Sequence, residues 1–279
     1  MKRASAKWIT SFCFAAALAL FVRNPAEAAE SPQRVVSINV CTDQLALVLA
    51  KDGQLRSVSY LSQDPELSVM AAKARKMLVN HAQAEEVFLM KPDLVLAGTF
   101  SSRATVGLLR RLGVRVEEFA PARSFDDIED HMRRMGELLG RQAEASREID
   151  KMKAALAAIQ PPTRRKTVAL YYANSYTSGR GTLVDEAVRL AGLDNLAERA
   201  GISGSGPLPL ERLLLEKPDI LVRSSRDRAP ALAFENFEHP ALRALEKRAR
   251  AVTIADNLTV CGGPFSVEAV AELAEAARD

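Results

Sequence analysis

One segment of the chain occurs twice, 126 residues apart. The first copy runs from Glu85 to Leu96 (EEVFLMKPDLVL) and the second from Glu211 to Val222 (ERLLLEKPDILV). Proline ends a helix and disfavours the helical conformation for the lysine before it. Each copy is therefore predicted to be a helix, a turn and a buried strand, and the chain to contain two similar α/β halves. The alternative is that a common helix-to-strand connection arose twice by chance.

Short apolar runs alternate with helical patterns on both sides of these copies. The predicted strands are residues 35–38, 57–60, 94–97, 114–119, 168–172, 219–223 and 251–254. The predicted helices are residues 43–50, 85–90, 105–112, 182–191, 210–216, 241–249 and 266–277. This alternation predicts mainly parallel sheets with helices on both faces.

A longer helical pattern separates the two halves. Ser124 is a suitable N-cap, no proline follows until Pro161, and apolar residues recur at a spacing of three to four. About 36 residues of helix would be roughly 54 Å long, which favours a rigid link between two lobes. The alternatives are an ordinary surface helix with an apolar stripe, or two helices broken near Gly136 and Gly140. We expect lobes at residues 29–123 and 161–279, with the link at 124–160.

The first 28 residues have the pattern of a secretory signal peptide. Three basic residues precede an apolar run of 11 residues from Phe12 to Val22, and Ala26 to Ala28 offers a small-x-small cleavage site. The run is too short to span a bilayer comfortably. We therefore expect an exported, released protein cleaved near Ala28, with a lipid-anchored protein and a retained anchor helix as the alternatives. Without residues 1–28, 38 basic and 35 acidic residues become 34 of each, which disfavours nucleic-acid binding.

Enzyme motifs are incomplete in this sequence. The segment from Gly201 to Ser205 lacks the closing glycine of a nucleophile elbow, and a Walker phosphate loop is absent. His81, His131 and His239 show no metal-binding spacing, and the last two are interpreted as surface residues. We predict no catalytic residues, no resident metal and no cofactor.

Loops at the carboxyl ends of strands are where open α/β sheets bind ligands. The loops in question are residues 39–42, 60–64, 99–103, 171–176 and 256–263. They contain tyrosines and both cysteines that lie outside the signal peptide, Cys41 and Cys261. Aromatic side chains in these loops suit a flat organic ligand, oriented by asparagine, threonine and aspartate.

With these features in view, the chain resembles the periplasmic substrate-binding proteins of ATP-driven (ABC) importers for ferric siderophores, haem and vitamin B12. The shared motifs are Arg34–Ser37, Glu85–Leu96, Leu112–Val114, Ser124 with the helix to Gly140, Thr177–Gly179, Leu190–Gly192, Glu211–Val222 and Gly262–Pro264. The resemblance implies two Rossmann-like lobes joined by a long linking helix, with a ligand cleft between them. It also implies a monomer that delivers its ligand to an inner-membrane permease.

The cleft loops and the resemblance together give the candidate ligand-binding residues. They are Asn39, Cys41, Tyr60, His81, Thr99, Phe100, Tyr172, Ser205, Asp256 and Cys261. Vitamin B12 binders have tryptophans at several cleft positions that read Val79, Gly98 and Ser205 in this sequence, which argues against a large corrin pocket. Relatives dock the permease through an acidic residue on each lobe, whereas the matched residue on the first lobe is Arg103.

The resemblance places Cys41 and Cys261 on cleft loops of opposite lobes. In an oxidising compartment they are a disulfide candidate. Two unpaired buried cysteines, or thiolate ligands to a soft metal complex with His81 as a third ligand, are the alternatives.

The expected function is capture of an iron chelate (siderophore), haem or a cobalamin-type ligand for an ABC importer. One alternative is a protein of the same fold that binds a bare metal ion. The other is an exported enzyme or sensor accessory that keeps the two lobes.

Overall fold

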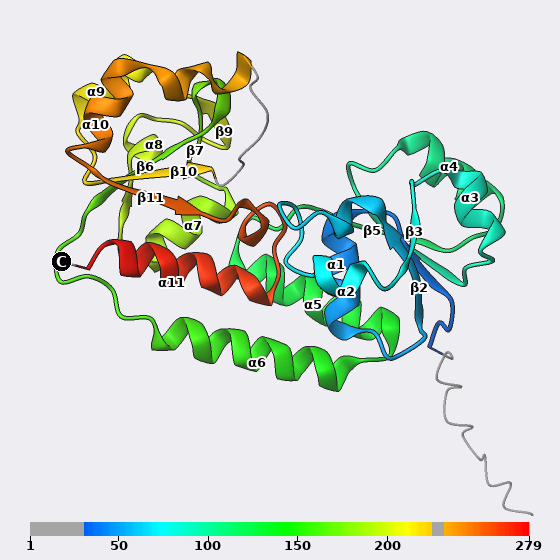
Figure 1. The fold of residues 1–279 in the computed structure, drawn as a ribbon. Coiled ribbons are helices and arrows are strands. Elements are labelled where there is room, and N and C mark those ends of the chain that lie inside the picture. The colour runs from blue at the N-terminus through cyan, green and yellow to red at the C-terminus, as the bar shows by residue number, and fades with distance from the viewer. Residues whose placement is uncertain (1–30, 225–231, 279) are drawn as a thin grey trace, which may run out of the picture. The chain divides into compact units, whose positions relative to one another are not determined.

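The structure, a computed structural model, describes residues 31–224 and 232–278. The predicted signal peptide lies outside the described residues. From Ser31 onward the chain forms one compact unit, which contains two parallel sheets and a small antiparallel one (Figure 1). None of the helices that the structure describes is both long and apolar enough to cross a lipid bilayer.

The first sheet has the strand order β3-β2-β1-β4-β5, and all four neighbouring pairs are parallel. Its strands are β1 (Val35–Ser37), β2 (Leu55–Ser59), β3 (Leu78–Asn80), β4 (Leu94–Gly98) and β5 (Val116–Phe119). The chain builds outward from β1 on one side and then returns to β4 on the other, as in a Rossmann-like fold. The short strand β3 was not predicted from the sequence.

The second sheet has the order β11-β10-β6-β8 and is also parallel. Its strands are β6 (Thr167–Tyr171), β8 (Asp194–Asn195), β10 (Ile220–Ser224) and β11 (Arg250–Ile254), and an antiparallel pair is formed by β7 (Tyr176–Ser178) and β9 (Ser205–Pro207). The strand that follows Lys-Pro-Asp lies beside the first strand of its sheet in both lobes, as β4 beside β1 and β10 beside β6. The two halves predicted from the repeat are therefore confirmed.

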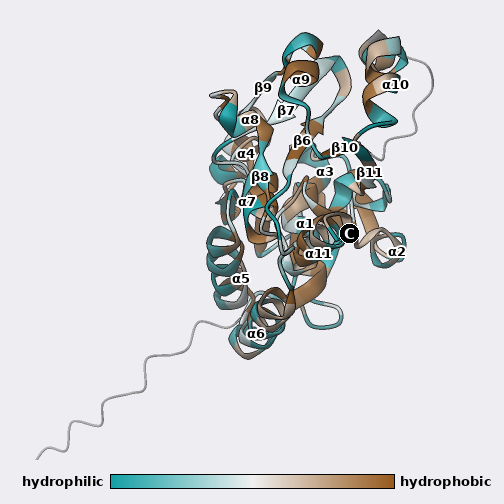
Figure 2. Cartoon of the chain, turned by 90° about the vertical axis from the view of Figure 1, so that its left-hand side faces the viewer, coloured by the Kyte–Doolittle hydropathy of each residue, from teal (hydrophilic) through white to brown (hydrophobic). Residues whose placement is uncertain are grey.

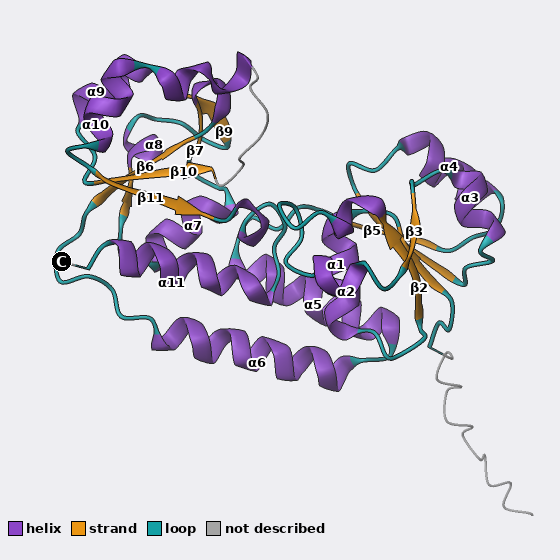
Figure 3. Cartoon of the chain, viewed as in Figure 1, coloured by secondary structure: helices purple, strands orange, loops and turns teal. Residues whose placement is uncertain are grey.

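Helices cover both faces of each sheet (Figure 3). The helices are α1 (Val40–Leu49), α2 (Ala71–Ala74), α3 (Ala84–Leu89), α4 (Arg103–Arg111), α5 (Phe125–Leu139), α6 (Gln142–Ala158), α7 (Leu183–Leu190), α8 (Leu196–Arg199), α9 (Leu210–Glu216), α10 (Pro240–Glu246) and α11 (Val267–Ala276). Side chains alternate across the strands. Val35 and Leu94 accordingly pack with α1 and α5, while Val36 and Val95 pack with α3 and α4.

In the second lobe, the same alternation of side chains assigns different helices to the two faces of the sheet. Ala169 and Leu221 pack against α8, α9 and α10, whereas Val168 and Ile220 pack against α7 and α11. The cluster that contains Val168 is the one that contains Val35 of the first lobe. One continuous apolar core therefore runs through both lobes.

The predicted long linking helix is two helices, α5 and α6. Ser124 caps α5 as predicted, since its Oγ accepts the Asp127 amide at 3.0 Å. Gly140 ends α5 with φ +67°, a left-handed conformation that glycine adopts readily. Gly136 lets the two helices pack closely, because a Cβ there would lie 2.7 Å from the Cβ of Ala145. The single helix was thus wrong, and the alternative of a break near Gly136 and Gly140 is confirmed.

Both helices run between the lobes. The Phe125 amide at the start of α5 donates to Glu186 of α7 at 2.6 Å. At the other end, Gln54 donates to the Leu139 carbonyl at 2.8 Å, and Arg141 donates to the Leu49 carbonyl at 3.1 Å. Figure 2 shows hydrophobic and hydrophilic residues recurring along α5, as expected for a helix with one apolar side.

The repeated Lys-Pro-Asp turn has the same backbone in both lobes. Lys91 and Lys217 have φ values of +50° and +47°, so the proline does exclude the helical conformation. The Asp93 carboxylate accepts the Arg34 amide at 2.9 Å, and the Asp219 carboxylate accepts the Thr167 amide at 2.8 Å. The backbone amides of Asp93 and Asp219 donate back to the carbonyls of these same two residues. Each aspartate therefore ties β4 or β10 to the start of the adjacent strand.

A buried carboxylate positions the loop after β2. Asp43 of α1 is fully buried, and its Oδ2 accepts hydrogen bonds from the Ser59 amide at 3.0 Å and from the hydroxyls of Ser59 and Ser62. Burial raises the pKa of Asp43 to about 6, against the lowering effect of the serine hydrogen bonds. These bonds hold the segment around Tyr60 against α1.

We predict that Asp93→Ala and Asp219→Ala each lower the free energy of unfolding by about 1 kcal/mol, since each removes a carboxylate that accepts a strand amide. Urea denaturation measures the change, with Asp150→Ala on the exposed side of α6 as the control. Equal stability of the three variants would contradict a role for the turn carboxylates.

A second prediction concerns pH and Asp43. Because the pKa of Asp43 is about 6 in the folded state, against 3.8 for an ordinary aspartate, the folded state binds the proton more tightly than the unfolded state. Its contribution to stability is present below pH 4 and is lost as the pH rises through about 6. The loss is about 3 kcal/mol, at about 1.4 kcal/mol for each pKa unit.

Asp43→Asn should remove this fall in stability with rising pH. Urea unfolding measured between pH 4 and 7 would detect the difference. Asp130→Asn at an exposed position of α5 is the control and should keep the fall. A pH dependence of Asp43→Asn that matches the wild type would refute the assignment.

Candidate functional site

A first cavity lies where β1 and β4 end, at the point where the order of the first sheet reverses. Its volume is about 160 Å³. It is lined by Asn39, Cys41, Thr42, Leu45, Gly98, Thr99, Phe100, Phe119, Ala120, Pro121, Ala122, His131, Val260, Cys261 and Gly262. Such reversal points are where open α/β sheets bind ligands.

Two backbone features shape this cavity. Asn39 is the N-cap of α1, and its side-chain oxygen accepts the Cys41 amide at 3.0 Å. Gly98 ends β4 so close to Asn39 that a Cβ there would lie 2.9 Å from the asparagine amide nitrogen. Beyond it, Phe100 is 85% exposed. An aromatic ring so exposed at the mouth of a cavity is placed to contact a ligand.

His131 was interpreted from the sequence as a surface residue, but it is half-buried and faces the first cavity. Its ring meets Phe119 edge to face, with 5.6 Å between the ring centroids. Burial lowers the pKa of His131, against the raising effect of Asp127. The imidazole is therefore mostly uncharged at neutral pH.

A second cavity, of about 310 Å³, lies at the carboxyl end of the second sheet. It is lined by Tyr172, Ala173, Ser178, Val184, Phe234, Asp256, Thr259 and Val260. Tyr172 follows β6, and its carbonyl accepts the Asn236 side chain at 2.9 Å. Burial raises the pKa of the Tyr172 phenol well above its usual range. The phenol therefore stays a neutral hydroxyl that can donate a hydrogen bond.

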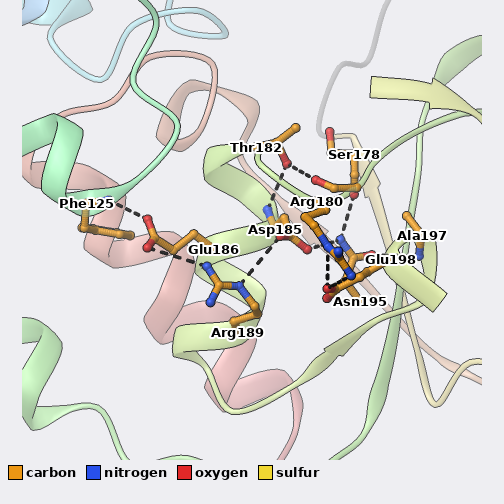
Figure 4. Close-up of polar contacts among 11 residues, drawn as sticks. Phe125, Ser178, Arg180, Thr182, Asp185, Glu186, Arg189, Asn195, Ala197 and Glu198 are labelled. Carbon is orange, nitrogen blue, oxygen red and sulfur yellow. Dashed lines mark hydrogen bonds and ion pairs between the residues drawn. The ribbon is translucent and has the colours of Figure 1, made fainter. Parts of the chain in front are cut away.

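Buried polar contacts hold the wall of the second cavity at Ser178 (Figure 4). The Asn195 side chain donates to the Ser178 carbonyl and to the Asp185 carboxylate, both at 2.8 Å. Thr182 caps α7 by accepting the Asp185 amide at 3.2 Å. The turn between β7 and α7 is thus fixed from both sides.

Cys41 and Cys261 form a disulfide, with their Cα atoms 5.1 Å apart. The disulfide interpretation is confirmed, and the unpaired-cysteine and thiolate-ligand interpretations were wrong. Among the described residues, no three His, Cys, Asp or Glu side chains form a group that could hold a metal ion.

The structure brings together most of the ten predicted site residues. Five of them line the first cavity: Asn39, Cys41, Thr99, Phe100 and Cys261. Tyr172 and Asp256 line the second cavity.

Three predicted residues line neither cavity. Tyr60 and His81 stack on each other at the ends of β2 and β3, with 5.3 Å between their rings. The imidazole of His81 lies 3.4 Å from the carboxylate of Glu86. Ser205 pairs with Ser178 between β9 and β7.

Sequence reasoning missed several lining residues. Phe119, His131, Phe234 and Val184 come from helices or from strand ends outside the predicted loops, so no local motif marked them. Val260 lay within the predicted loop 256–263 but was not singled out, although it lines both cavities. A third hollow of about 670 Å³, between α6, β11 and α11, is lined by alanines, by charged residues and by Ile159, Val252, Thr253 and Ile254, and contains no aromatic ring.

The chain matches known proteins over most of its length. The family model for periplasmic binding proteins matches residues 35–250. A "Cobalamin-binding protein" of Halobacterium salinarum is 29% identical over 214 residues, which cover 72% of this chain and 57% of that protein. The chain thus spans little more than half the length of this curated relative. An "Uncharacterized ABC transporter substrate-binding lipoprotein", YvrC of Bacillus subtilis, is 26% identical over 88% of this chain and 80% of that protein.

Solved structures share the fold. The "Periplasmic heme-binding protein RhuT from Roseiflexus sp. RS-1" superposes with a TM-score of 0.70 and 23% identity, covering 88% of this chain and 99% of that one. At this identity the likeness supports the fold alone. The family match, by contrast, covers more than half of the chain. The chain belongs to the periplasmic binding protein family.

Proposed function

We propose that this chain is the solute-binding component of an ABC importer and that it captures a metal chelate or tetrapyrrole-type ligand. The observation that carries this proposal is the pair of cavities at the carboxyl ends of the two parallel sheets, which share Val260 as a wall. A ligand that occupies both cavities contacts both lobes at once. Family membership and the curated relatives, one of which is named for cobalamin and one for ABC transport, support this role.

The lining favours an organic ligand over a bare metal ion. Phe100, Phe119, Tyr172 and Phe234 present aromatic surface, and uncharged polar groups stand beside them at Asn39 and Thr99. Bare cations need several oxygen, nitrogen or sulfur ligands at short range. Aromatic walls with a few polar groups suit the flat or hydrophobic body of a siderophore, haem or corrin. We infer that the protein acts as an exported, periplasmic monomer, because one chain supplies both walls.

The test is binding of three probes by the purified mature protein: haemin, cyanocobalamin and a ferric trihydroxamate. Absorption spectra and titration calorimetry should show one of them binding with a stoichiometry of one per chain. Phe100→Ala should weaken that binding about tenfold, as expected for the loss of a buried aromatic contact. Phe88→Ala, on α3 outside both cavities, is the control and should bind as the wild type does.

Failure of all three probes would count against this ligand class. Binding of a free metal ion alone would favour the bare-ion alternative, and turnover of a probe would favour an enzyme.

The repeated helices α3 and α9 suggest how the permease is recognised. Leu89 and Leu215 occupy equivalent positions of the repeat and are 78% and 76% exposed. Four residues before each leucine lies an exposed glutamate, Glu85 or Glu211. Residues four apart share one face of a helix. Each lobe therefore presents the same pair of an acidic and an apolar side chain to the solvent.

We infer that these two pairs dock the inner-membrane permease. Two equivalent patches on one chain fit a partner with two equivalent subunits or halves. Each half would supply a basic residue for the glutamate and an apolar pocket for the leucine. This assignment replaces Arg103, the position matched from the sequence, with a pair that the repeat itself supplies.

The double charge reversal Glu85→Arg/Glu211→Arg should abolish ligand uptake by cells and leave the ligand affinity of the purified protein within twofold of wild type. Glu137→Arg, an equal reversal on the exposed side of α5, should leave both unchanged. Normal uptake by the double variant would rule out docking through α3 and α9.

A further inference from the structure

The loop of residues 256–263, here called the cleft loop, belongs to the second lobe but is attached to the first. It follows β11 of the second sheet. The Asn257 side chain donates to the Pro65 carbonyl, in the loop that follows β2, at 2.8 Å. Cys261 is bonded to Cys41 at the start of α1. These two attachments join positions about 190 and 220 residues apart in the chain.

A third contact lies beside the disulfide. Gly262 packs so tightly against the segment before α5 that a Cβ on it would lie 2.5 Å from the Cβ of Ala122. The same Cβ would lie 2.8 Å from Cγ1 of Ile128. The disulfide is the covalent member of this set, and Cys261 is only 2% exposed. The position of the cleft loop therefore depends on contacts with the first lobe as well as on its own lobe.

The cleft loop is also the wall between the two cavities. Val260, Cys261 and Gly262 line the first cavity, while Asp256, Thr259 and Val260 line the second. Val260 is 44% exposed, so its side chain stands free on the ligand side. Any displacement of the cleft loop therefore changes both cavities together.

We propose that the Cys41–Cys261 disulfide is a redox-sensitive clamp that holds the cleft loop in its ligand-binding position. The inference rests on the proposed function, whose site it regulates. A dithiol reductant supplies two electrons and two protons, the S–S bond breaks, two thiols form, and the reductant becomes a disulfide. Of the three attachments to the first lobe described above, the Asn257–Pro65 hydrogen bond and the packing of Gly262 remain, and ligand affinity falls. In an oxidising compartment the clamp stays closed.

The first measurement is hydrogen exchange of the mature wild-type protein, oxidised and after reduction with dithiothreitol. Amides of the cleft loop should exchange at least tenfold faster after reduction, and reoxidation should restore their protection. Amides of β4 and β10, which belong to the sheets, should change little and serve as the internal control. Unchanged exchange of the cleft loop would overturn the clamp, whether or not a ligand is known.

The second measurement is affinity, made with whichever of haemin, cyanocobalamin and a ferric trihydroxamate the oxidised wild type binds. Cys41→Ser/Cys261→Ser should bind it at least tenfold more weakly at a temperature where circular dichroism shows the variant folded. Val260→Ala should weaken binding with the disulfide intact, whereas Leu78→Ala, outside both cavities, should not. If the serine variant does not fold, reduced and desalted wild type kept under anaerobic conditions replaces it.

An unchanged affinity of the folded, disulfide-free protein would show that the bond only stabilises the fold, and would overturn the proposal. If the oxidised wild type binds none of the probes, the proposed ligand class fails instead, and hydrogen exchange still decides whether the disulfide holds the loop.

Discussion

Two aspartate carboxylates fix the pairing of the central strands in both sheets, and the positions of the binding loops depend on that pairing. Asp93 and Asp219 each accept the backbone amide at the start of the neighbouring strand, at 2.9 and 2.8 Å. Lysine rarely adopts a positive φ, and the cost is about 1 kcal/mol or more. Lys91 and Lys217 do so at the same turn, and the strand hydrogen bonds that the turn brings into place offset this cost. Once β4 lies beside β1 and β10 beside β6, the carboxyl ends of all four strands have fixed positions.

The cavities follow from that pairing. Asn39 and Thr99 can meet in the first cavity because β1 and β4 are neighbours in register. Tyr172 reaches the second cavity because β6 is central in the second sheet. The cleft loop then closes the space from the second lobe while it is bonded to the first. The Lys-Pro-Asp turn therefore fixes which strands pair, and the pairing of the strands through backbone hydrogen bonds fixes where the binding residues lie.

What the sequence could predict depended on how local the signal was. The Lys-Pro-Asp turns and their strands were readable because proline acts on its neighbours. The position of the helix break was not settled, because Gly136 and Gly140 look alike in the sequence. Only in three dimensions is one a packing contact and the other a left-handed C-cap. Strands as short as β3 and β8 carry too few residues to show a pattern.

Contacts between distant parts of the chain were harder still. Cys41 and Cys261 are separated by 220 residues, so their bond stayed one of three interpretations. His131 was assigned to the surface because it lies on the predicted linking helix and belongs to no metal-binding motif. Tyr60 and His81, which stack on each other after β2 and β3, were predicted to line the cleft, Tyr60 from its loop and from the family resemblance and His81 from the resemblance alone. These strands lie away from the β1–β4 reversal, which explains why the pair falls outside the first cavity.

The places where the two halves differ are where ligand choice must reside. The repeated turns, with the same backbone in each lobe, cannot distinguish one ligand from another. Phe100 follows the strand after the first turn, and the equivalent position after the second turn has no aromatic residue. The cleft loop, which follows β11, has Cys261 bonded to the other lobe. The segment that follows β5 in the first lobe, residues 120–124, contains no cysteine. Exchanging side chains at Phe100 and Val260 is therefore the rational route to a changed ligand preference, because neither residue takes part in the strand pairing that holds the lobes.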